Sequence, residues 1–547
     1  MKKHLQPMMR ALAGVLAALT LAGCAASGNG SPKQETPTAP RTAVTTQALT
    51  TVDRSQITEP PDTHPAETEK KPTVKREKID NSKLIPKIQP DEKVQLETTG
   101  DLATPDWFKS AVMVEMRIAT ATPEGTFDAA TSLLKMYAEM GVNCIWLTPI
   151  YEMGPGGNGY GNCGLHTLEP SLTGTKNVDE GWEVVADFVD AAHRRNIRVL
   201  LDIVTWGAMK NCPLTQEHPE FFDGEAWGNA AFNWKNEDFK EWFIQNAVDN
   251  IIRSGADGYR CDCEPNYAGY DVFAEIRQRL LKQGRKVVIL AEDGNDRRSA
   301  FDSEMDGVLD YNIRSRGQQY TNPVHFYLDD LNIVDSIKSG KGIGQERLQR
   351  SGKGGRFRYY TFCLTNHDYQ HRVVNGNRLV AGYQAIYAPF IPYWYMGDEG
   401  GVTMGKQAVL YDVAVDVASI EDRAFYEDLK QMIRIRRTYA DIFEYFPDDH
   451  RESNICKVET TGLTALQAYA RYAGEHAVLI IPNNEEKSDG AFTATIPYDE
   501  MNLPDGDYTL TDLLTGEVVA EGSRSSLTSF SGKVAFEYMG VYLIEKK

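Results

Sequence analysis

The sequence predicts an α/β protein, a (β/α)8 TIM barrel that is followed by a small C-terminal antiparallel β-sandwich. Between residues 110 and 445, eight short apolar runs alternate with longer amphipathic segments, which is typical of parallel strands and crossover helices. After residue 445 the pattern changes to short strands separated by polar turns. The 547 residues accommodate a barrel of about 250 residues together with a second domain. An open doubly wound sheet produces the same alternation, so it remains an alternative on pattern alone.

The first segment, residues 1–23, has the features of a secretion signal. Three basic residues precede an uncharged apolar stretch, 11–22, that is too short to cross a bilayer as a mature helix. The segment ends in Leu-Ala-Gly before Cys24, which resembles the bacterial lipoprotein box, and the resemblance implies that Cys24 carries acyl chains. Several such chains give a stable membrane anchor. The alternative is ordinary cleavage near Ala22, which would leave Cys24 as a free thiol.

Residues 24–100 are expected to form a disordered tether between this anchor and the folded part. The segment is rich in Pro, Thr, Ser, Glu and Lys and has almost no aromatic residues. Such a composition buries too little apolar surface to fold, and its prolines favour extended conformations.

The barrel is expected over residues 101–446 and the β-sandwich over residues 447–547. The strand candidates of the barrel are 111–118, 144–150, 198–204, 258–262, 286–292, 307–312, 359–366 and 391–397. The helix candidates are 127–140, 182–195, 239–253, 272–281, 376–387 and 425–439. A short insert, about 205–233, follows the third strand. The strand candidates of the sandwich are 465–472, 476–482, 506–519 and 533–545.

Charge and cysteine content exclude two classes of site. The chain carries 58 Lys and Arg against 77 Asp and Glu, a net charge of −19 that repels polyanions and excludes nucleic acid as a partner. The eight cysteines have no zinc-site spacing. Cys144 and Cys363 lie in apolar runs and are expected to be core thiols. Cys163 and Cys212 fall in loops, and whether they pair is left open by the sequence.

Charged side chains gather where three predicted strands end, which is where a barrel places its reactive groups. The fourth strand ends with Arg260 and Asp262, two positions apart and therefore on one side of the strand. Arg260 is expected to keep Asp262 ionised and to lower its pKa, as a nucleophile requires. The fifth strand ends with Glu292, whose pKa burial would raise toward that of a general acid. The seventh ends with His367 and Asp368.

With these residues in this order, the chain resembles the α-amylase family, glycoside hydrolase family 13, over about 330 residues. The resemblance is carried by the Gly-x-Arg-x-Asp run at 258–262, the Glu at 292, the Asn-His-Asp run at 366–368 and the Gly-Tyr pair at 159–160. It implies that Asp262 is the nucleophile, Glu292 the acid and then the base, and Asp368 the carboxylate that binds the sugar hydroxyls. It also implies substrate-binding roles, namely orientation of Asp262 by Arg260, stacking by Tyr160 and a hydrogen bond from His367. The implied chemistry is a retaining double displacement with carboxyl groups about 5 Å apart.

The third strand departs from the family pattern, which reads Asp-x-Val-x-Asn-His. Here the run is Asp202-Ile-Val-Thr-Trp206-Gly207, so the Asn that helps to bind structural calcium and the sugar-binding His are both absent. Asp202 is retained and is expected to support the catalytic residues. We therefore expect no required cofactor, no metal ligands and no family calcium site. Trp206 could stack on a sugar or pack in the barrel.

The sequence thus predicts an enzyme, a glycosidase of the α-amylase type that hydrolyses α-1,4-linked glucans such as starch and maltooligosaccharides. Its expected partners are an α-glucan and, through the lipid on Cys24, a membrane, which locates it outside the cytoplasm at the bacterial cell surface. The alternatives are an α-glucanotransferase that uses the same residues and a catalytically weakened glucan-binding lipoprotein.

Overall fold

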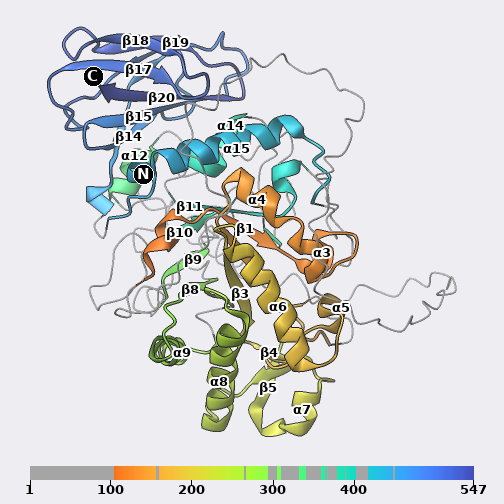
Figure 1. The fold of residues 1–547 in the computed structure, drawn as a ribbon. Helices are drawn as coiled ribbons and strands as arrows, with labels where there is room; N and C mark the ends of the chain where they lie inside the picture. Colours follow the sequence, from red (N-terminus) through yellow and green to blue (C-terminus); the bar gives the residue numbers. More distant parts are fainter. Residues whose placement is uncertain are drawn as a thin grey trace, which may run out of the picture.

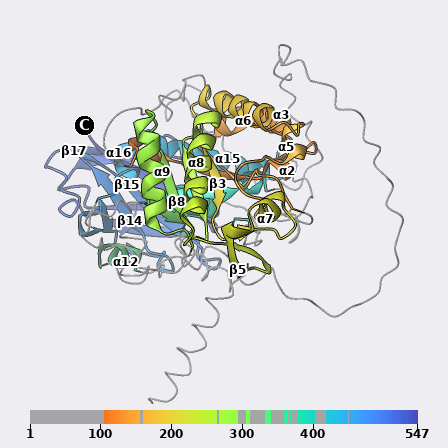
Figure 2. The same ribbon diagram turned by 90° about the horizontal axis from the view of Figure 1, so that it is seen from below.

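A closed barrel of eight parallel strands forms the centre of the protein (Figures 1 and 2). The computed structural model describes residues 104–154, 159–263, 267–292, 305–309, 332–339, 359–363, 366–367, 378–387, 390–401, 417–447 and 450–547. The strands follow the order β1-β11-β10-β9-β8-β7-β3-β2, and β1 pairs with both β2 and β11, which closes the sheet. An open doubly wound sheet is thereby excluded.

Each of the eight predicted apolar runs contains one barrel strand. The strands are β1 (Met113–Met116), β2 (Cys144–Leu147), β3 (Arg198–Val204), β7 (Gly258–Asp262), β8 (Val288–Ala291), β9 (Gly307–Leu309), β10 (Tyr359–Phe362) and β11 (Ile391–Tyr395). Gly258 opens β7 because no larger residue fits there. A Cβ atom at this position would lie 1.9 Å from the carbonyl oxygen of Val288 on β8.

The strands are buried on both sides, which explains their nearly continuous apolar sequences. Alternate side chains fill the barrel interior, among them Met113, Trp146, Leu200, Leu290 and Tyr393. The intervening side chains pack against the outer helices. The thiols of Cys144 and Cys363 lie in the interior set, as predicted for core cysteines.

Helices cover the outside of the barrel, and Figure 2 shows α6, α8 and α9 around strands β3 and β8. The helices of four or more residues are α2 (Ile118–Ala121), α3 (Phe127–Thr131), α4 (Leu134–Met140), α5 (Pro170–Thr173), α6 (Val178–His193), α7 (Pro213–Glu217), α8 (Glu237–Ser254), α9 (Tyr270–Lys282), α12 (Ile333–Ser339), α14 (Arg378–Gly382), α15 (Arg423–Thr438) and α16 (Ala440–Phe443). A π-helical turn, Tyr383–Tyr387, continues α14. Short 3-10 helices span Asp106–Ser110, Pro219–Phe221, Asp398–Gly400 and His450–Glu452.

The helix predicted over 127–140 is divided at Ser132 into α3 and α4. The Ser132 hydroxyl and amide both donate to the carbonyl of Ala129, and the Leu133 amide donates to the carbonyl of Ala130. A serine side chain that competes for backbone carbonyls in this way tightens the turn and interrupts the regular α-helical pattern.

The insert after β3 forms a small antiparallel sheet. Its strands are β4 (Gly207–Ala208), β5 (Phe222–Ala226) and β6 (Asn229–Phe232), in the order β4-β6-β5. A disulfide between Cys163 and Cys212, 49 residues apart in the sequence, joins the insert to the loop that follows β2. The structure thus settles the pairing that the sequence left open.

Two antiparallel sheets form the C-terminal domain, which Figure 1 shows at one end of the barrel beyond α14 and α15. The larger sheet has the order β12-β14-β15-β20-β17-β18 and the smaller one the order β13-β16-β19. The strands are β12 (Ile455–Lys457), β13 (Thr460–Thr461), β14 (Tyr469–Ala473), β15 (His476–Asn483), β16 (Ala491–Thr495), β17 (Asp507–Asp512), β18 (Val518–Ser523), β19 (Ser529–Lys533) and β20 (Tyr538–Lys546). A core of its own lies between the sheets, as predicted for a sandwich.

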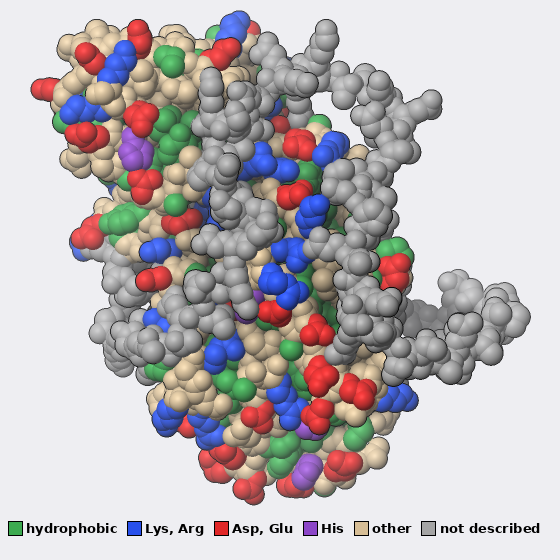
Figure 3. All heavy atoms as spheres, in the orientation of Figure 1, with side chains coloured by type: hydrophobic (Ala, Val, Ile, Leu, Met, Phe, Trp, Pro, Cys, Tyr) green, Lys and Arg blue, Asp and Glu red, His purple; other side chains and the backbone are tan. Residues whose placement is uncertain are grey.

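On the face seen in Figure 3, charged side chains of both signs are interspersed and the visible hydrophobic side chains form small separate groups. Within the described ranges, no helix is both long enough and apolar enough to cross a bilayer. The predicted signal, the predicted tether and Cys24 lie outside the described residues.

Candidate active site

The carboxyl ends of β3, β7 and β8 bring together charged residues predicted from the sequence. β7 pairs in parallel with β8 so that Cys261 is opposite Ala291, and the Glu292 amide donates to the Cys261 carbonyl at 3.2 Å. Asp262 and Glu292 therefore follow each other around the same end of the barrel. On the other side of β7, Asp202 of β3 lies opposite Arg260.

Arg260 forms the centre of the site. Its side chain is fully buried, and its guanidinium group pairs with three carboxylates. One terminal nitrogen contacts Asp202 at 3.0 Å and Asp262 at 2.8 Å, and the other contacts Glu292 at 2.7 Å. Because a buried carboxylate needs a partner, this single cation stabilises all three side chains in one place.

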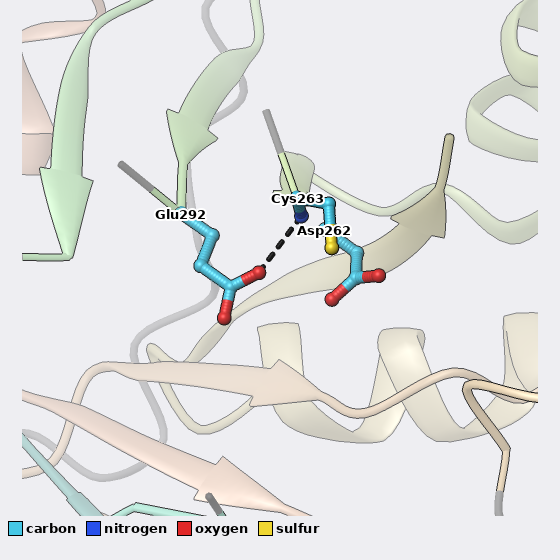
Figure 4. Close-up of side chains that lie close together, drawn as sticks. All are labelled: Asp262, Cys263 and Glu292. Carbon is cyan, nitrogen blue, oxygen red and sulfur yellow. Dashed lines mark hydrogen bonds between the residues drawn. The ribbon is translucent and has the colours of Figure 1, made fainter. Parts of the chain in front are cut away.

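The side chains of Asp262 and Glu292 reach into the same space beyond the strand ends, together with that of Cys263 (Figure 4). Oxygen atoms of the two carboxyl groups and the Cys263 sulfur lie within 4.8 Å of one another. Cys263 has a left-handed backbone, with φ of 58°, and its amide donates to Glu292 Oε2 at 2.8 Å. Sequence reasoning missed Cys263, whose signal was its position directly after the candidate nucleophile.

The pKa of Asp262 is shifted in the direction opposite to our expectation. Burial and the neighbouring Glu292 carboxylate raise it well above the usual aspartate value, and Arg260 opposes this shift without cancelling it. The prediction of a net lowering by Arg260 is therefore wrong for the substrate-free site. Since the two carboxyl groups interact strongly, they titrate as a pair, and the pair holds its first proton more tightly than an isolated carboxyl would.

Asp202 connects Arg260 to two aromatic side chains. Its Oδ2 accepts hydrogen bonds from Trp146 Nε1 and from the Tyr160 hydroxyl, both at 3.0 Å. Burial is the largest effect on this carboxyl and raises its pKa to about 6, against the opposing charge of Arg260. Trp146 was missed by sequence reasoning, because a Trp inside an apolar strand reads as packing.

Tyr160 and His367 lie against each other. Their rings are stacked, with centroids 4.6 Å apart and an interplanar angle of 13°. His367 Nδ1 also contacts Oε1 of Glu115 on β1, and the His367 amide donates to Glu115 Oε2 at 3.3 Å. Sequence reasoning missed Glu115, although a single carboxylate inside an apolar strand was the signal for a buried partner. Asp368 lies outside the described residues, so the structure does not locate the third predicted carboxylate.

One group within the described ranges has the composition and spacing of metal ligands, namely Asp262, Cys263 and Glu292. Arg260 already supplies a cation to both of these carboxylates. The arrangement is therefore that of two carboxyl groups around an arginine, which suits proton transfer and nucleophilic attack.

The two positions after β3 that depart from the family pattern have structural explanations. Trp206 is only 5% exposed and packs inside the protein rather than standing in the open. At Gly207 a Cβ atom would lie 2.0 Å from the Ala230 carbonyl oxygen of β6, so the sheet of the insert leaves no room for a histidine. Thr205, between these positions and Val204, donates its hydroxyl to the Asp262 carbonyl at 2.8 Å.

Comparisons with known proteins agree with this fold. No protein-family model matches the chain. The malto-oligosyltrehalose trehalohydrolase of Saccharolobus solfataricus is 26% identical over 332 residues, which cover 53% of this chain and 57% of that protein. The chain thus spans little more than half the length of this relative. The cyclomaltodextrinase of Geobacillus thermopakistaniensis is 23% identical over 481 residues, 78% of this chain and 76% of that protein.

A solved structure extends the comparison over a larger part of the chain than the first relative covers. The maltogenic α-amylase AmyB from Thermotoga neapolitana has a TM-score of 0.62 and 17% sequence identity, and the match covers 80% of this chain and 98% of that chain. The sequence relatives and structural neighbours are enzymes of the α-amylase family, and this chain is similar to them in sequence and has their barrel fold with a C-terminal β domain.

Proposed function

We propose that the protein is a retaining glycosidase that hydrolyses α-1,4-linked glucans by double displacement. The observation that carries this proposal is the distance between Asp262 and Glu292, whose carboxylate oxygens lie within 4.8 Å of each other beside a shared arginine. Retaining glycosidases hold their two carboxyl groups about 5–5.5 Å apart, whereas inverting enzymes separate them by about 6.5–9.5 Å to admit a water molecule.

In the first step Glu292 donates its proton to the glycosidic oxygen while Asp262 attacks the anomeric carbon. The bond to the leaving sugar breaks, and a covalent β-glycosyl ester forms on Asp262. Arg260 contacts Asp262 at 2.8 Å and so orients the attacking oxygen.

In the second step Glu292, now ionised, takes a proton from water, and the water oxygen attacks the anomeric carbon. The ester bond breaks, Asp262 leaves as a carboxylate, and the sugar is released with its original α configuration. In this proposal Asp368 binds the sugar hydroxyls and Tyr160 and His367 contact the same ring. The stacked pair of Tyr160 and His367 next to Asp202 supports that role.

The substrate class is supported by the names of the relatives, which include a cyclomaltodextrinase and a maltogenic α-amylase. Transfer of the glycosyl group to a sugar hydroxyl would use the same residues and is the second candidate. A glucan-binding protein without turnover is the third, and it is disfavoured because Arg260, Asp262 and Glu292 are in contact.

We also propose that turnover requires no calcium. The proposal is supported by Trp206, a buried indole in place of the family's Asn ligand, and by the hydroxyl of Thr205, which is engaged with the Asp262 carbonyl. Activity that is unchanged after dialysis against a chelator is the expected result, and loss of activity that added calcium restores would contradict it.

A lipid anchor on Cys24 outside the cytoplasm completes the proposal. The Cys163–Cys212 disulfide supports it, since such bonds persist mainly in oxidising compartments. Fatty-acid labelling in cells tests the anchor. Wild type is expected to incorporate label and to sediment with membranes, whereas Cys24→Ala should do neither.

The decisive experiment uses the full chain in mild detergent with maltoheptaose and with soluble starch. The expected products are shorter maltooligosaccharides. NMR should show that their newly formed reducing ends initially have the α configuration. Initially β products would contradict retention, and products longer than the substrate would identify a transferase.

Two variants test the assigned roles. Asp262→Asn should abolish detectable turnover, and Glu292→Gln should lower kcat by about 10²–10⁴-fold because the general acid is lost. Asp238→Asn and Glu237→Gln, at exposed positions in the first turn of α8, are matched controls and should keep the wild-type rate. Near wild-type rates in Asp262→Asn or Glu292→Gln, with folded protein by circular dichroism, would refute the roles.

A further inference from the structure

Glu115 is a fully buried carboxylate at the active site that the proposed mechanism does not use. It lies on β1, where its neighbours across the sheet are Trp146 on β2 and Tyr395 on β11. Both of its oxygens are directed at one residue. Oε1 contacts His367 Nδ1, and Oε2 accepts the His367 backbone amide at 3.3 Å. A buried carboxylate is costly unless it is paired and hydrogen-bonded, and His367 supplies both of these contacts to Glu115.

The second observation is that His367 is held from other directions as well. Tyr160 stacks on its ring at 4.6 Å, and the Trp146 ring meets it edge-on at 5.8 Å. Tyr160 in turn donates to Asp202, which pairs with Arg260. Glu115 is thus the β1 end of a continuous buried chain of contacts that reaches Asp262 and Glu292 through Arg260.

We propose that Glu115 is a positioning residue that fixes the orientation and tautomer of His367 and so sets the face of the site that binds the reacting sugar. The inference rests on the function proposed above. Because an ionised Glu115 can only accept a hydrogen bond, His367 must carry its proton on Nδ1. The nitrogen turned away from β1 is then Nε2, which is left to face the sugar.

A purely structural role for Glu115 is the competing explanation, and it makes a different prediction. If the ion pair only stabilises the barrel, substitution lowers stability and leaves the kinetics of the folded enzyme unchanged. If Glu115 positions His367, the loss is seen in kcat more than in KM, since hydrogen bonds to the sugar strengthen in the transition state.

The test compares Glu115→Gln with wild type on maltoheptaose, as full chains. Glutamine keeps the size of the side chain and one acceptor oxygen but removes the charge. We expect kcat to fall about tenfold or more, with a smaller change in KM. Tyr160, which stacks on His367, and Asp202, which accepts a hydrogen bond from Tyr160, are unchanged in this variant.

A double-mutant cycle separates an effect through His367 from a general one. In a His367→Asn background the Glu115→Gln change should have no further effect on kcat, because the group that Glu115 positions is gone. Glu399→Gln is the matched control. Glu399 is equally buried and accepts hydrogen bonds from Tyr137 and Trp394, both at 2.8 Å, without contacting His367. Its effect on kcat should be the same in both backgrounds.

Three results would overturn the inference. If wild type is active and Glu115→Gln has the same kcat, the inference alone is overturned. Equal losses of kcat from Glu115→Gln in the wild-type and His367→Asn backgrounds would also overturn the inference alone. An inactive wild type that also binds no maltoheptaose by calorimetry would overturn the proposed function, and this inference with it.

Discussion

At the scale of single residues, the site depends on how one buried guanidinium is shared. Arg260 contacts Asp202, Asp262 and Glu292, so three carboxylates compete for a single positive charge. The consequence is visible at Asp202, whose pKa is raised to about 6 by burial despite its contact with Arg260. A carboxyl with this pKa changes its charge within the range in which enzymes are normally assayed.

The raised pKa of Asp202 predicts a specific pH dependence of stability. Between pH 6 and the ordinary carboxyl pKa of about 4, the folded protein binds a proton at Asp202 that the unfolded chain does not bind. The stability that Asp202 contributes therefore increases as the pH falls from 7 to 5. We therefore expect the Tm of wild type, relative to that of Asp202→Asn, to be higher at pH 5 than at pH 7. Thermal unfolding of both proteins at the two pH values measures this difference.

Asp238→Asn, at an exposed position of α8, serves as the control and should show the same Tm difference from wild type at both pH values. If Asp202→Asn also gave a difference independent of pH, burial would not be raising the pKa of this carboxyl.

Which site residues could be predicted depends on where they stand in the strands. Asp262 and Glu292 end apolar runs, where a charge has no packing explanation, and the structure places them together at the end of the barrel. Glu115 and Trp146 lie inside their strands, one residue before each strand ends. Their side chains point into the barrel and reach the site from the barrel interior. Only the pairing register shows that Glu115 and Trp146 are neighbours.

At the scale of elements, apolar runs were sufficient to find all eight barrel strands, because strands covered on both faces have few polar residues to break the pattern. Helix ends were less predictable. The run 376–387 was expected to be one helix, and its described part divides into α14 and a π-helical turn. The change occurs at Gly382, the last residue of α14, where a Cβ atom would lie 2.4 Å from the sulfur of Met539 on β20, so the C-terminal domain packs closely against the helix at this point.

The insert sheet makes a prediction about Gly207. A methyl group there would collide with the backbone of Ala230, at 2.0 Å from its carbonyl oxygen, so Gly207→Ala should push β4 away from β6. Overpacking of this kind costs about 1–3 kcal/mol. Since the insert is tied to the protein through the Cys163–Cys212 disulfide, whose Cys212 is fully buried, we also expect this bond to be reduced faster in the variant. Thiol titration against time measures the rate.

Gly224→Ala is the matched control for Gly207→Ala. Gly224 has φ of 80°, but nothing lies within 4 Å of a Cβ atom at that position. Its substitution should cost only the left-handed conformation, about 1 kcal/mol, and leave the reduction rate unchanged. Equal reduction rates of the disulfide in both variants and in wild type would show that β6 moves to accommodate the methyl group of Gly207→Ala.

At the scale of the whole molecule, the barrel and the C-terminal domain share a hydrophobic cluster at their boundary, in addition to the core between the two C-terminal sheets. Leu379 and Tyr387 of the barrel pack in the same cluster as Tyr469, Met539 and Leu543 of the larger sheet. Hydrogen bonds cross the boundary as well, for example from the Tyr387 hydroxyl to the Gln467 carbonyl at 2.9 Å. The domains are therefore expected to unfold together rather than one after the other.

The distribution of tryptophan allows this coupling to be measured directly. All eight tryptophans lie between residues 107 and 394, so tryptophan fluorescence follows the barrel alone.

Leu479 is fully buried in the core between the two C-terminal sheets and lies in a cluster separate from that of the barrel. Leu479→Ala should cost about 2–5 kcal/mol. If the domains are coupled, the fluorescence transition in urea moves to lower denaturant together with the circular dichroism transition. A fluorescence midpoint that stays at the wild-type value while part of the circular dichroism signal is lost earlier would show instead that the shared cluster does not couple them.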